Sequence, residues 1–163
     1  MDRAPRSTEI DVHDGIRSTI TMLGHKLRSK DIVLRTDFDT DTPHISGNPG
    51  ELNQVWTNLL DNAIDAVAQG GEITVRTSGT ATGAQIEIVD DGTGIPEEIR
   101  GRIFDPFYTT KEVGHGTGLG LDVARRVVEG HRGEVSVESE PGRTCFTIRL
   151  PRSEPADGDA APS

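Results

Sequence analysis

Residues 48–67 have the sequence NPGELNQVWTNLLDNAIDAV, which predicts a long helix with one apolar face. Asn48 can cap the first turn, Pro49 suits the first helical position, and Glu51 stands where the acid of a capping box belongs. The apolar face consists of Leu52, Val55, Trp56, Leu59, Leu60, Ala63, Ile64 and Val67. A single apolar face needs one partner surface, so this helix is expected to cover a sheet.

The opposite face of this helix is polar and carries Glu51, Gln54, Asn58, Asp61, Asn62 and Asp65. On the residues alone, a solvated surface and a binding site both remain open. Asparagine at positions 58 and 62 favours a site, because asparagine costs about 0.7 kcal/mol relative to alanine inside a helix. Two amides one turn apart can ligate Mg²⁺ or orient a phosphate.

The rest of the chain predicts two more helices and five strands around this element. Helices are predicted over residues 11–29, capped by Asp11, and over 118–130. Alternating apolar residues predict strands at 31–38, 72–78, 84–90, 133–139 and 144–150, with a hairpin joining the second and third. These elements predict an α+β fold, a two-layer α/β sandwich in which the helices cover one face of a mostly antiparallel sheet.

The composition suits one folded domain, predicted over residues 10–151 between a flexible linker (1–9) and a disordered tail (152–163). A net charge of −10 argues against nucleic-acid and anionic-membrane partners, which clustered Lys and Arg would bind. No stretch approaches the roughly 18 apolar residues of a membrane span, and the N-terminus lacks the apolar core of a signal peptide. We therefore expect a cytoplasmic, monomeric domain without direct membrane contact.

The segment VDDGTGIP, residues 89–96, places two carboxylates at the end of a predicted strand. Gly92 and Gly94 follow, and glycine permits tight turns and close approach of a ligand to the backbone. Asp90 can accept a hydrogen bond from an adenine amino group. An ordinary Asp-Gly turn is the alternative.

A second glycine-rich segment, GHGTGLGL at residues 114–121, leads into a predicted helix. Exposed backbone N–H groups at a helix N-terminus favour phosphate, although a merely flexible loop has the same composition. Neither the G-x-G-x-x-G pattern nor a P-loop lysine motif fits the chain. Just before it, IFDPFYTTK (103–111) contributes Phe104 and Lys111, and Lys111 can reach a terminal phosphate.

In this order, LNQVWTNLLDNAIDA, VDDGTGIP, IFDPFYTTK and GHGTGLGL resemble four motifs of sensor histidine kinases, a branch of the superfamily of gyrase and mismatch-repair ATPases. The closing segment HRGEVSVESEPGRTCFTIRLP also resembles that family. The resemblance implies the Bergerat-type ATPase fold, whose sheet is mixed with helices on one face. It implies ATP and Mg²⁺ as cofactors.

By the resemblance, Asn62 is the expected Mg²⁺ ligand, Asn58 a second ligand and catalytic residue, Asp90 the residue that recognises adenine, and Thr144 the support of a bridging water. The loop from Phe107 to His115 is expected to act as a lid over ATP. The full expected nucleotide site comprises Asn58, Asn62, Asp65, Asp90, Gly92, Gly94, Ile95, Phe104, Gly114, Gly116, Thr117, Gly118, Leu119, Gly120 and Thr144.

Two positions depart from related proteins. Many histidine kinases have lysine where this chain has Asp65, as in the nitrogen-regulation-like branch, so Lys111 becomes the expected catalytic cation near the γ-phosphate. Gyrase-type ATPases have a glutamate base where this chain has Asn58, so little ATP hydrolysis is expected.

The implied function is transfer of the γ-phosphate of ATP to a histidine on a separate dimerisation domain of the same kinase, with a response regulator as an indirect partner. His13-Asp14 begins like a phosphoacceptor motif but lacks the Arg and Pro that follow it there. The alternatives are an ATP-binding regulatory module that transfers no phosphate and a serine kinase or ATPase of the same superfamily.

Overall fold

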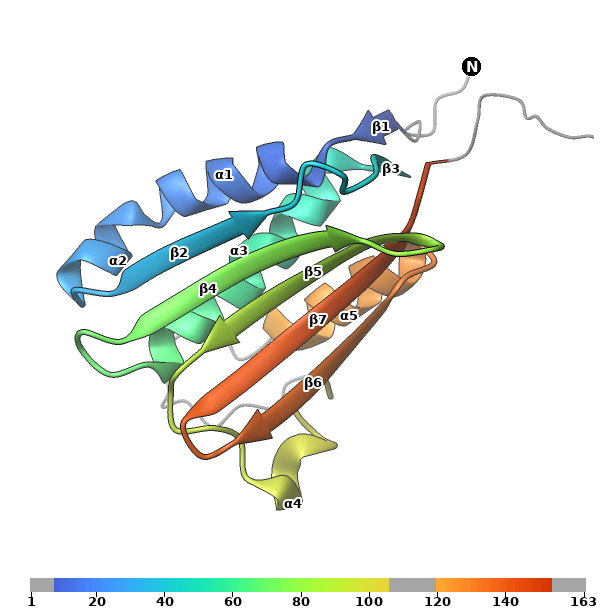
Figure 1. Ribbon diagram of the computed structural model, residues 1–163. Helices are drawn as coiled ribbons and strands as arrows, with labels where there is room; N and C mark the ends of the chain where they lie inside the picture. Colours follow the sequence, from blue (N-terminus) through green and yellow to red (C-terminus); the bar gives the residue numbers. More distant parts are fainter. Residues whose placement is uncertain (1–7, 106–119, 154–163) are drawn as a thin grey trace, which may run out of the picture.

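The computed structural model describes residues 8–105 and 120–153, which form a two-layer sandwich of a sheet and helices (Figure 1). The strands of the main sheet are β2 (Val33–Phe38), β4 (Glu72–Gly79), β5 (Gly83–Asp90), β6 (Glu134–Glu140) and β7 (Arg143–Pro151). Their order across the sheet is β2-β4-β5-β7-β6. β2 runs parallel to β4 and every other neighbouring pair is antiparallel, which confirms the predicted mixed, mostly antiparallel sheet.

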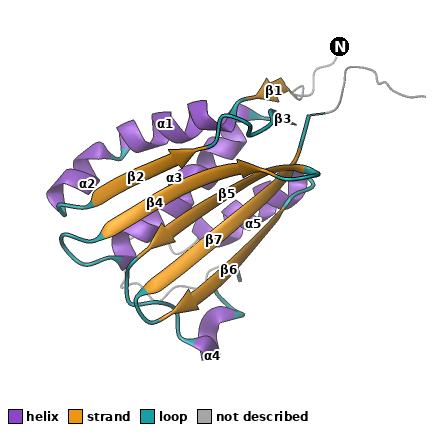
Figure 2. Ribbon diagram, viewed as in Figure 1, coloured by secondary structure: helices purple, strands orange, loops and turns teal. Residues whose placement is uncertain are grey.

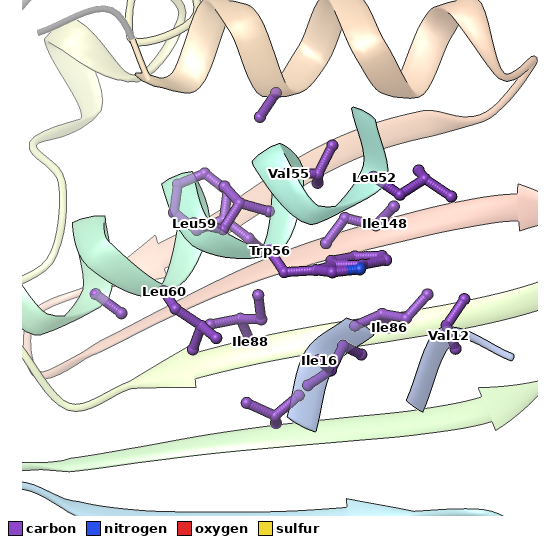
Figure 3. Packing of buried hydrophobic residues seen from close by; sticks show 14 of the residues in the cluster. Val12, Ile16, Leu52, Val55, Trp56, Leu59, Leu60, Ile86, Ile88 and Ile148 are labelled. Atoms are coloured by element: carbon purple, nitrogen blue, oxygen red, sulfur yellow. The ribbon is translucent and has the colours of Figure 1, made fainter. Parts of the chain in front are cut away.

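Three helices, α1 (Val12–Met22), α3 (Pro49–Ala66) and α5 (Gly120–Gly130), cover one face of this sheet (Figure 2). α3 lies between the other two and contacts both. Leu52, Val55 and Trp56 of α3 are buried beside Ile86 and Ile148 of the sheet (Figure 3). The predicted apolar face of this helix is therefore the centre of the core. Among the described residues no helix is long and apolar enough to cross a membrane.

The structure differs from the sequence prediction in the first helix. Residues 11–29 form α1 and a separate helix α2 (Gly24–Ser29), which meet at Leu23. Leu23 has a ψ of 7°, outside the helical range, while its side chain is buried. The chain turns there, which brings α2 beside the C-terminal half of α3 through contacts of Lys26 and Lys30.

Three short elements were missed. β1 (Thr8–Ile10) and β3 (Ile45–Gly47) pair as a small antiparallel sheet, and α4 (Glu97–Arg100) lies within the predicted loop 91–118. Too few residues are present in each for a periodic pattern to emerge. Because β1 includes residues 8 and 9, the predicted linker 1–9 extends too far; residues 1–7 lie outside the described part.

The predicted tail also begins too early. The backbone N–H of Arg152 donates to Thr82 O at 3.0 Å, and that of Ser153 donates to His44 O at 2.8 Å. Backbone hydrogen bonds do not depend on side-chain type, so the amino-acid composition of residues 152–163 could not reveal them. The whole polar segment was therefore predicted to be a tail. Residues 154–163 lie outside the described part.

The cap of α3 differs in one detail from a capping box. The Asn48 side chain accepts from the backbone N–H of Glu51 at 3.0 Å, as predicted. The backbone N–H of Asn48, however, donates to His131 Nε2 at 3.1 Å, instead of to Glu51. His131 Nδ1 lies 2.9 Å from Val127 O, so the neutral ring with its proton on Nδ1 satisfies both contacts. The ring thereby joins the start of α3 to the end of α5.

The other end of α3 is closed by a lysine. Lys30 Nζ donates to the backbone oxygens of Ile64 and Val67, each at 2.7 Å. A cation at a helix C-terminus both satisfies free carbonyls and complements the helix dipole. Lys30 therefore fixes the last turn of α3.

Replacing Lys30 with methionine is expected to lower the free energy of unfolding by about 1–3 kcal/mol, because two partly buried carbonyls lose their donor. Lys26→Met is the matched control. Its ion pair with Asp61 is exposed, so its loss should cost less than about 1 kcal/mol. Urea unfolding followed by Trp56 fluorescence measures both, and equal losses would contradict the role given to Lys30.

Candidate functional site

The polar face of α3 is partly enclosed by its neighbours. Asn58 and Asn62 are half-buried, and the amide of Asn58 donates to the backbone oxygen of Gly120 at 3.0 Å. On the same polar face, Lys26 Nζ of α2 lies 2.6 Å from Asp61, and this hydrogen bond raises the pKa of Lys26. A purely solvated face would not link two neighbouring helices. Asp65, at the same end of the helix, is exposed.

Asp90 lies at the end of β5 with only 2% of its surface exposed. Its Oδ1 accepts from the backbone N–H of Gly92 at 2.9 Å, the one hydrogen bond given to this carboxylate within the described ranges. Burial raises the pKa of Asp90, the Gly92 N–H opposes that rise, and the charge of Asp91 adds to it. A buried carboxylate with an oxygen still free to accept is unfavourable unless a donor binds it.

The segment after Asp90 passes very close to its neighbours. A Cβ added at Gly94 would lie 2.5 Å from the backbone oxygen of Glu140, and Gly94 has a φ of 89°. A Cβ at Gly92 would collide with the backbone oxygen of Ala66, at the end of α3. Both glycines are therefore required sterically. They hold Asp90 against α3 on one side and β6 on the other.

Thr144 faces Asp90 across the sheet as its partner in the β5–β7 register, and only 4% of it is exposed. Thr144 Oγ1 lies 2.8 Å from Ser139 Oγ, which also accepts from the backbone N–H of Ile95 at 2.7 Å. Sequence reasoning missed Ser139. The sequence pattern that could have identified Ser139 is its place in β6, where it follows Val135 and Val137 at every second position and is the polar residue on that inward face.

Phe104 contacts Phe146 edge to face, with 6.1 Å between ring centroids. The guanidinium of Arg125 lies 5.8 Å from the Phe104 ring. Both Phe104 and Ile95 are partly buried against the core. The packing interpretation of Phe104 therefore has direct support, while its role in binding stays a prediction.

Other predicted residues lie outside the described part of the chain, so their place in the site stays a prediction: Lys111, Gly114, Gly116, Thr117, Gly118 and Leu119. The predicted lid, Phe107 to His115, lies outside it too. Gly120, the last glycine of that segment, begins α5 and contacts Asn58. The structure thus joins the polar face of α3 to the start of α5 and places Asp90, Gly94 and Thr144 at the far end of α3.

His13 is enclosed in the fold, with 8% of its surface exposed. Its Nε2 lies 2.7 Å from Thr77 Oγ1, and its ring stacks on Phe38 at a centroid distance of 4.6 Å. Burial lowers the pKa of His13 despite the opposing charge of Asp11. An imidazole held in this way cannot approach a phosphate donor without unfolding the start of α1.

These residues fit a nucleotide and a magnesium ion. The amide oxygens of Asn58 and Asn62 are hard ligands of the kind Mg²⁺ accepts, usually few in number beside phosphate and water. Within residues 8–105 and 120–153, the Asp90 carboxylate accepts one hydrogen bond, from Gly92 N–H to Oδ1.

Comparison with known proteins agrees with this geometry. A sequence model of the histidine kinase-, DNA gyrase B- and HSP90-like ATPases matches residues 47–154. Sporulation kinase C of Bacillus subtilis is 38% identical over 83% of the chain and 32% of its own length. The sensory histidine kinase/phosphatase NtrB of Rhodobacter capsulatus is 35% identical over 91% of the chain and 45% of its own length. The chain thus spans about a third to a half of these relatives.

Solved structures show the same fold. The catalytic domain of the histidine kinase ThkA superposes with a TM-score of 0.83 at 29% identity, over 91% of this chain and 97% of that one. A structure of ThkA in complex with the response regulator TrrA has a TM-score of 0.77 at 27% identity, over 90% of this chain and 42% of that one.

Gly94→Ala should lower the free energy of unfolding by about 1–3 kcal/mol, because the added Cβ strains a positive-φ residue against Glu140. Gly101→Ala is the control, since its Cβ meets nothing within 4 Å and its φ is −74°. That change should be neutral or stabilise by up to about 1 kcal/mol. Thermal unfolding of the two variants tests this; a tolerated Gly94→Ala would contradict the close approach.

Asp90→Asn should increase stability at neutral pH, because it removes a buried charge and keeps an acceptor for Gly92 N–H. A raised pKa means that the folded state holds the proton more tightly. The stabilising effect of that proton is complete below the ordinary aspartate pKa of about 3.9 and is lost as pH rises through the raised value. The stability difference between variant and wild type should therefore shrink on acidification. Urea unfolding at several pH values measures it, and a difference independent of pH would refute the assignment.

Proposed function

The chain belongs to the family of histidine kinase-, DNA gyrase B- and HSP90-like ATPases, and from this membership we propose that it binds ATP with Mg²⁺ and donates the γ-phosphate to a histidine of a dimerisation domain. The single observation that carries the proposal is Asp90, a buried carboxylate that accepts only one hydrogen bond from the described residues and whose pKa is raised by that burial. An adenine amino group is a donor of the right kind for it.

The site extends along α3 in a way that suits a nucleotide. We assign the adenine end to Asp90, Gly94 and Thr144 and the phosphate end to Asn58, Asn62 and the start of α5 at Gly120. In this assignment Asn58 has two tasks, since its amide nitrogen donates to Gly120 O and its oxygen has no donor among the described residues. The contact couples the ligand residues of α3 to the position of α5.

The residues act by binding and positioning. Bound ATP·Mg²⁺ supplies the phosphoryl group and the charge neutralisation of the transfer. Asn58 and Asn62 hold the phosphate end in place, Asp90 fixes the other end, and Lys111 is assigned to the γ-phosphate as a mobile cation. No carboxylate stands at position 58 to activate water, so we expect slow hydrolysis in the absence of an acceptor. Positioning of two reactants is then the main source of rate.

The acceptor histidine is assigned to a separate domain of the same kinase. His13 is buried and hydrogen-bonded within the fold, which argues against it as the acceptor. The curated relatives are two to three times longer than the segment they share with this chain, leaving room for such a domain. ThkA has been seen in complex with a response regulator, and we propose such a regulator as the indirect partner here. We also propose a cytoplasmic location and a monomeric isolated domain.

Two alternatives remain within the family. A regulatory module would bind ATP without transferring it, and a serine kinase or ATPase would use another acceptor. Adding a histidine-containing dimerisation domain of a sensor kinase with γ-labelled ATP separates them. Acid-labile, base-stable label on the added domain supports histidine transfer; acid-stable label supports serine transfer, and no label supports the regulatory module.

Asp90→Ala should weaken ATP binding by at least about tenfold, since a hydrogen bond to a buried charge contributes about 1.5–3 kcal/mol. Asn62→Ala should weaken binding of ATP in the presence of Mg²⁺ but have little effect in EDTA. Asn53→Ala is the control, because Asn53 lies on the same helix but adjoins Gly15 of α1. Calorimetric titration measures all three. Undiminished binding by the Asp90 and Asn62 variants would refute the proposed site.

A further inference from the structure

We propose that Ser139 is a positioning residue that fixes the hydroxyl proton of Thr144 in the direction of the bound base, and so helps select adenine. The inference rests on the proposed function, because it concerns the adenine end of that site. Ser139 belongs to β6, outside the four sequence motifs that indicated the site. It is joined to the site by two short hydrogen bonds.

The first step concerns Ser139 as an acceptor. The backbone N–H of Ile95 lies 2.7 Å from Ser139 Oγ, and an N–H group can only donate. The hydroxyl of Ser139 is therefore the acceptor, and its own proton must point elsewhere. This contact also ties Ile95, and with it the turn at Gly94, to β6.

The second step concerns the proton of Ser139. Two acceptors lie within reach, Thr144 Oγ1 at 2.8 Å and the backbone oxygen of Arg143 at 3.4 Å. The shorter contact has the usual length of a hydroxyl hydrogen bond, and the longer one is marginal. Either hydroxyl can donate in the shorter contact, and we assign Ser139 as its donor and Thr144 as its acceptor. The chain of donors runs from Ile95 through Ser139 to Thr144.

The third step concerns the proton of Thr144. Since Thr144 Oγ1 already accepts from Ser139, its own proton is left to donate to a further group. Thr144 is paired with Asp90 in the register of β5 and β7, so both side chains leave the same face of the sheet. No hydrogen bond joins the two side chains in the described part of the molecule. We place a water or an atom of the base between these two side chains.

Together the two side chains present a fixed acceptor and a fixed donor. Adenine carries the complementary pair on its Watson–Crick edge, an amino donor at N6 and an acceptor at N1. Guanine carries the reverse pair, an acceptor at O6 and a donor at N1–H. A Thr144 proton held toward the base, directly or through one water, thus favours adenine over guanine. Without Ser139 the Thr144 hydroxyl can rotate and either accept or donate.

The test compares three nucleotides in calorimetric titrations of wild type and Ser139→Ala. They are ATP, 1-deaza-ATP, in which a C–H replaces the N1 acceptor, and purine riboside triphosphate, which lacks the N6 amino group. Wild type should prefer ATP over each analogue. In Ser139→Ala, the preference over 1-deaza-ATP should fall about 2- to 10-fold, the effect of one neutral hydrogen bond, while the preference over purine riboside triphosphate is retained. Ser136→Ala, on the same strand but facing away with Thr147, should change neither preference.

The outcomes separate this inference from its premise and from a merely structural role. A wild-type chain that shows no preference for ATP over purine riboside triphosphate would refute the proposed adenine contact of Asp90. Equal weakening of all three nucleotides in Ser139→Ala would show that Ser139 only anchors Ile95, and would overturn the inference. The double variant Thr144→Val/Ser139→Ala should prefer ATP over 1-deaza-ATP as strongly as Thr144→Val alone does. Ser139 acts on this preference only by orienting the Thr144 hydroxyl, which both of these variants lack.

Two variants of nearly the same shape as each other, Ser139→Thr and Ser139→Val, test the inference if Ser139→Ala folds poorly. Ser139→Thr keeps the hydroxyl and should keep the preference for ATP over 1-deaza-ATP. Ser139→Val has a side chain of almost the same shape without the hydroxyl, and should lose that preference to the same extent as alanine. Equal preferences in the threonine and valine variants would overturn the inference.

Discussion

The burial of the apolar face of α3 against the sheet is the interaction on which the rest of the molecule depends. Trp56, Leu59 and Val55 are almost completely excluded from solvent there. With that face fixed, the helix has no freedom to rotate about its axis, so Asn58 and Asn62 must project from the side away from the sheet. The same packing sets the position of the last turn, whose carbonyl at Ala66 lies against Gly92. One apolar contact surface thereby places both ends of the candidate site.

Electrostatics at the site work against the stability of the empty fold. Asp90 is buried beside Asp91 and receives one hydrogen bond from the described part of the chain, from the backbone of Gly92, and burial raises its pKa. A site that is complementary to a donor before the donor arrives loses little free energy to reorganisation on binding. The unfavourable charge is kept in place by rigid surroundings, namely the sheet register with Thr144 and the two glycine contacts. The buried charge of Asp90 thus lowers the stability of the fold without ligand while it provides the acceptor for a bound donor.

The sequence predicted the long elements and missed the contacts between them. Apolar periodicity over residues 48–67 was sufficient to identify α3 and its polar face, because eight apolar positions repeat with one period. β1 and β3, at three residues each, are too short for such a signal. Their pairing depends on chain segments far apart in sequence. Ser139 and His131 were not identified as partners for the same reason, since each acts on a backbone N–H tens of residues away.

The contact between His131 and Asn48 has a consequence for how the chain folds. The two residues are separated by 83 positions, so the backbone N–H of Asn48 gains this partner only when a long loop has closed. The helix at the centre of the core therefore gains its full stability only after α5 has docked. Long-range contacts of this kind slow folding and couple distant segments into one cooperative transition. A nascent chain that ends before residue 131 would keep the local Asn48 side-chain cap of α3 but lack the tie from Asn48 to His131, and the fold would form as a unit once the last two strands are available.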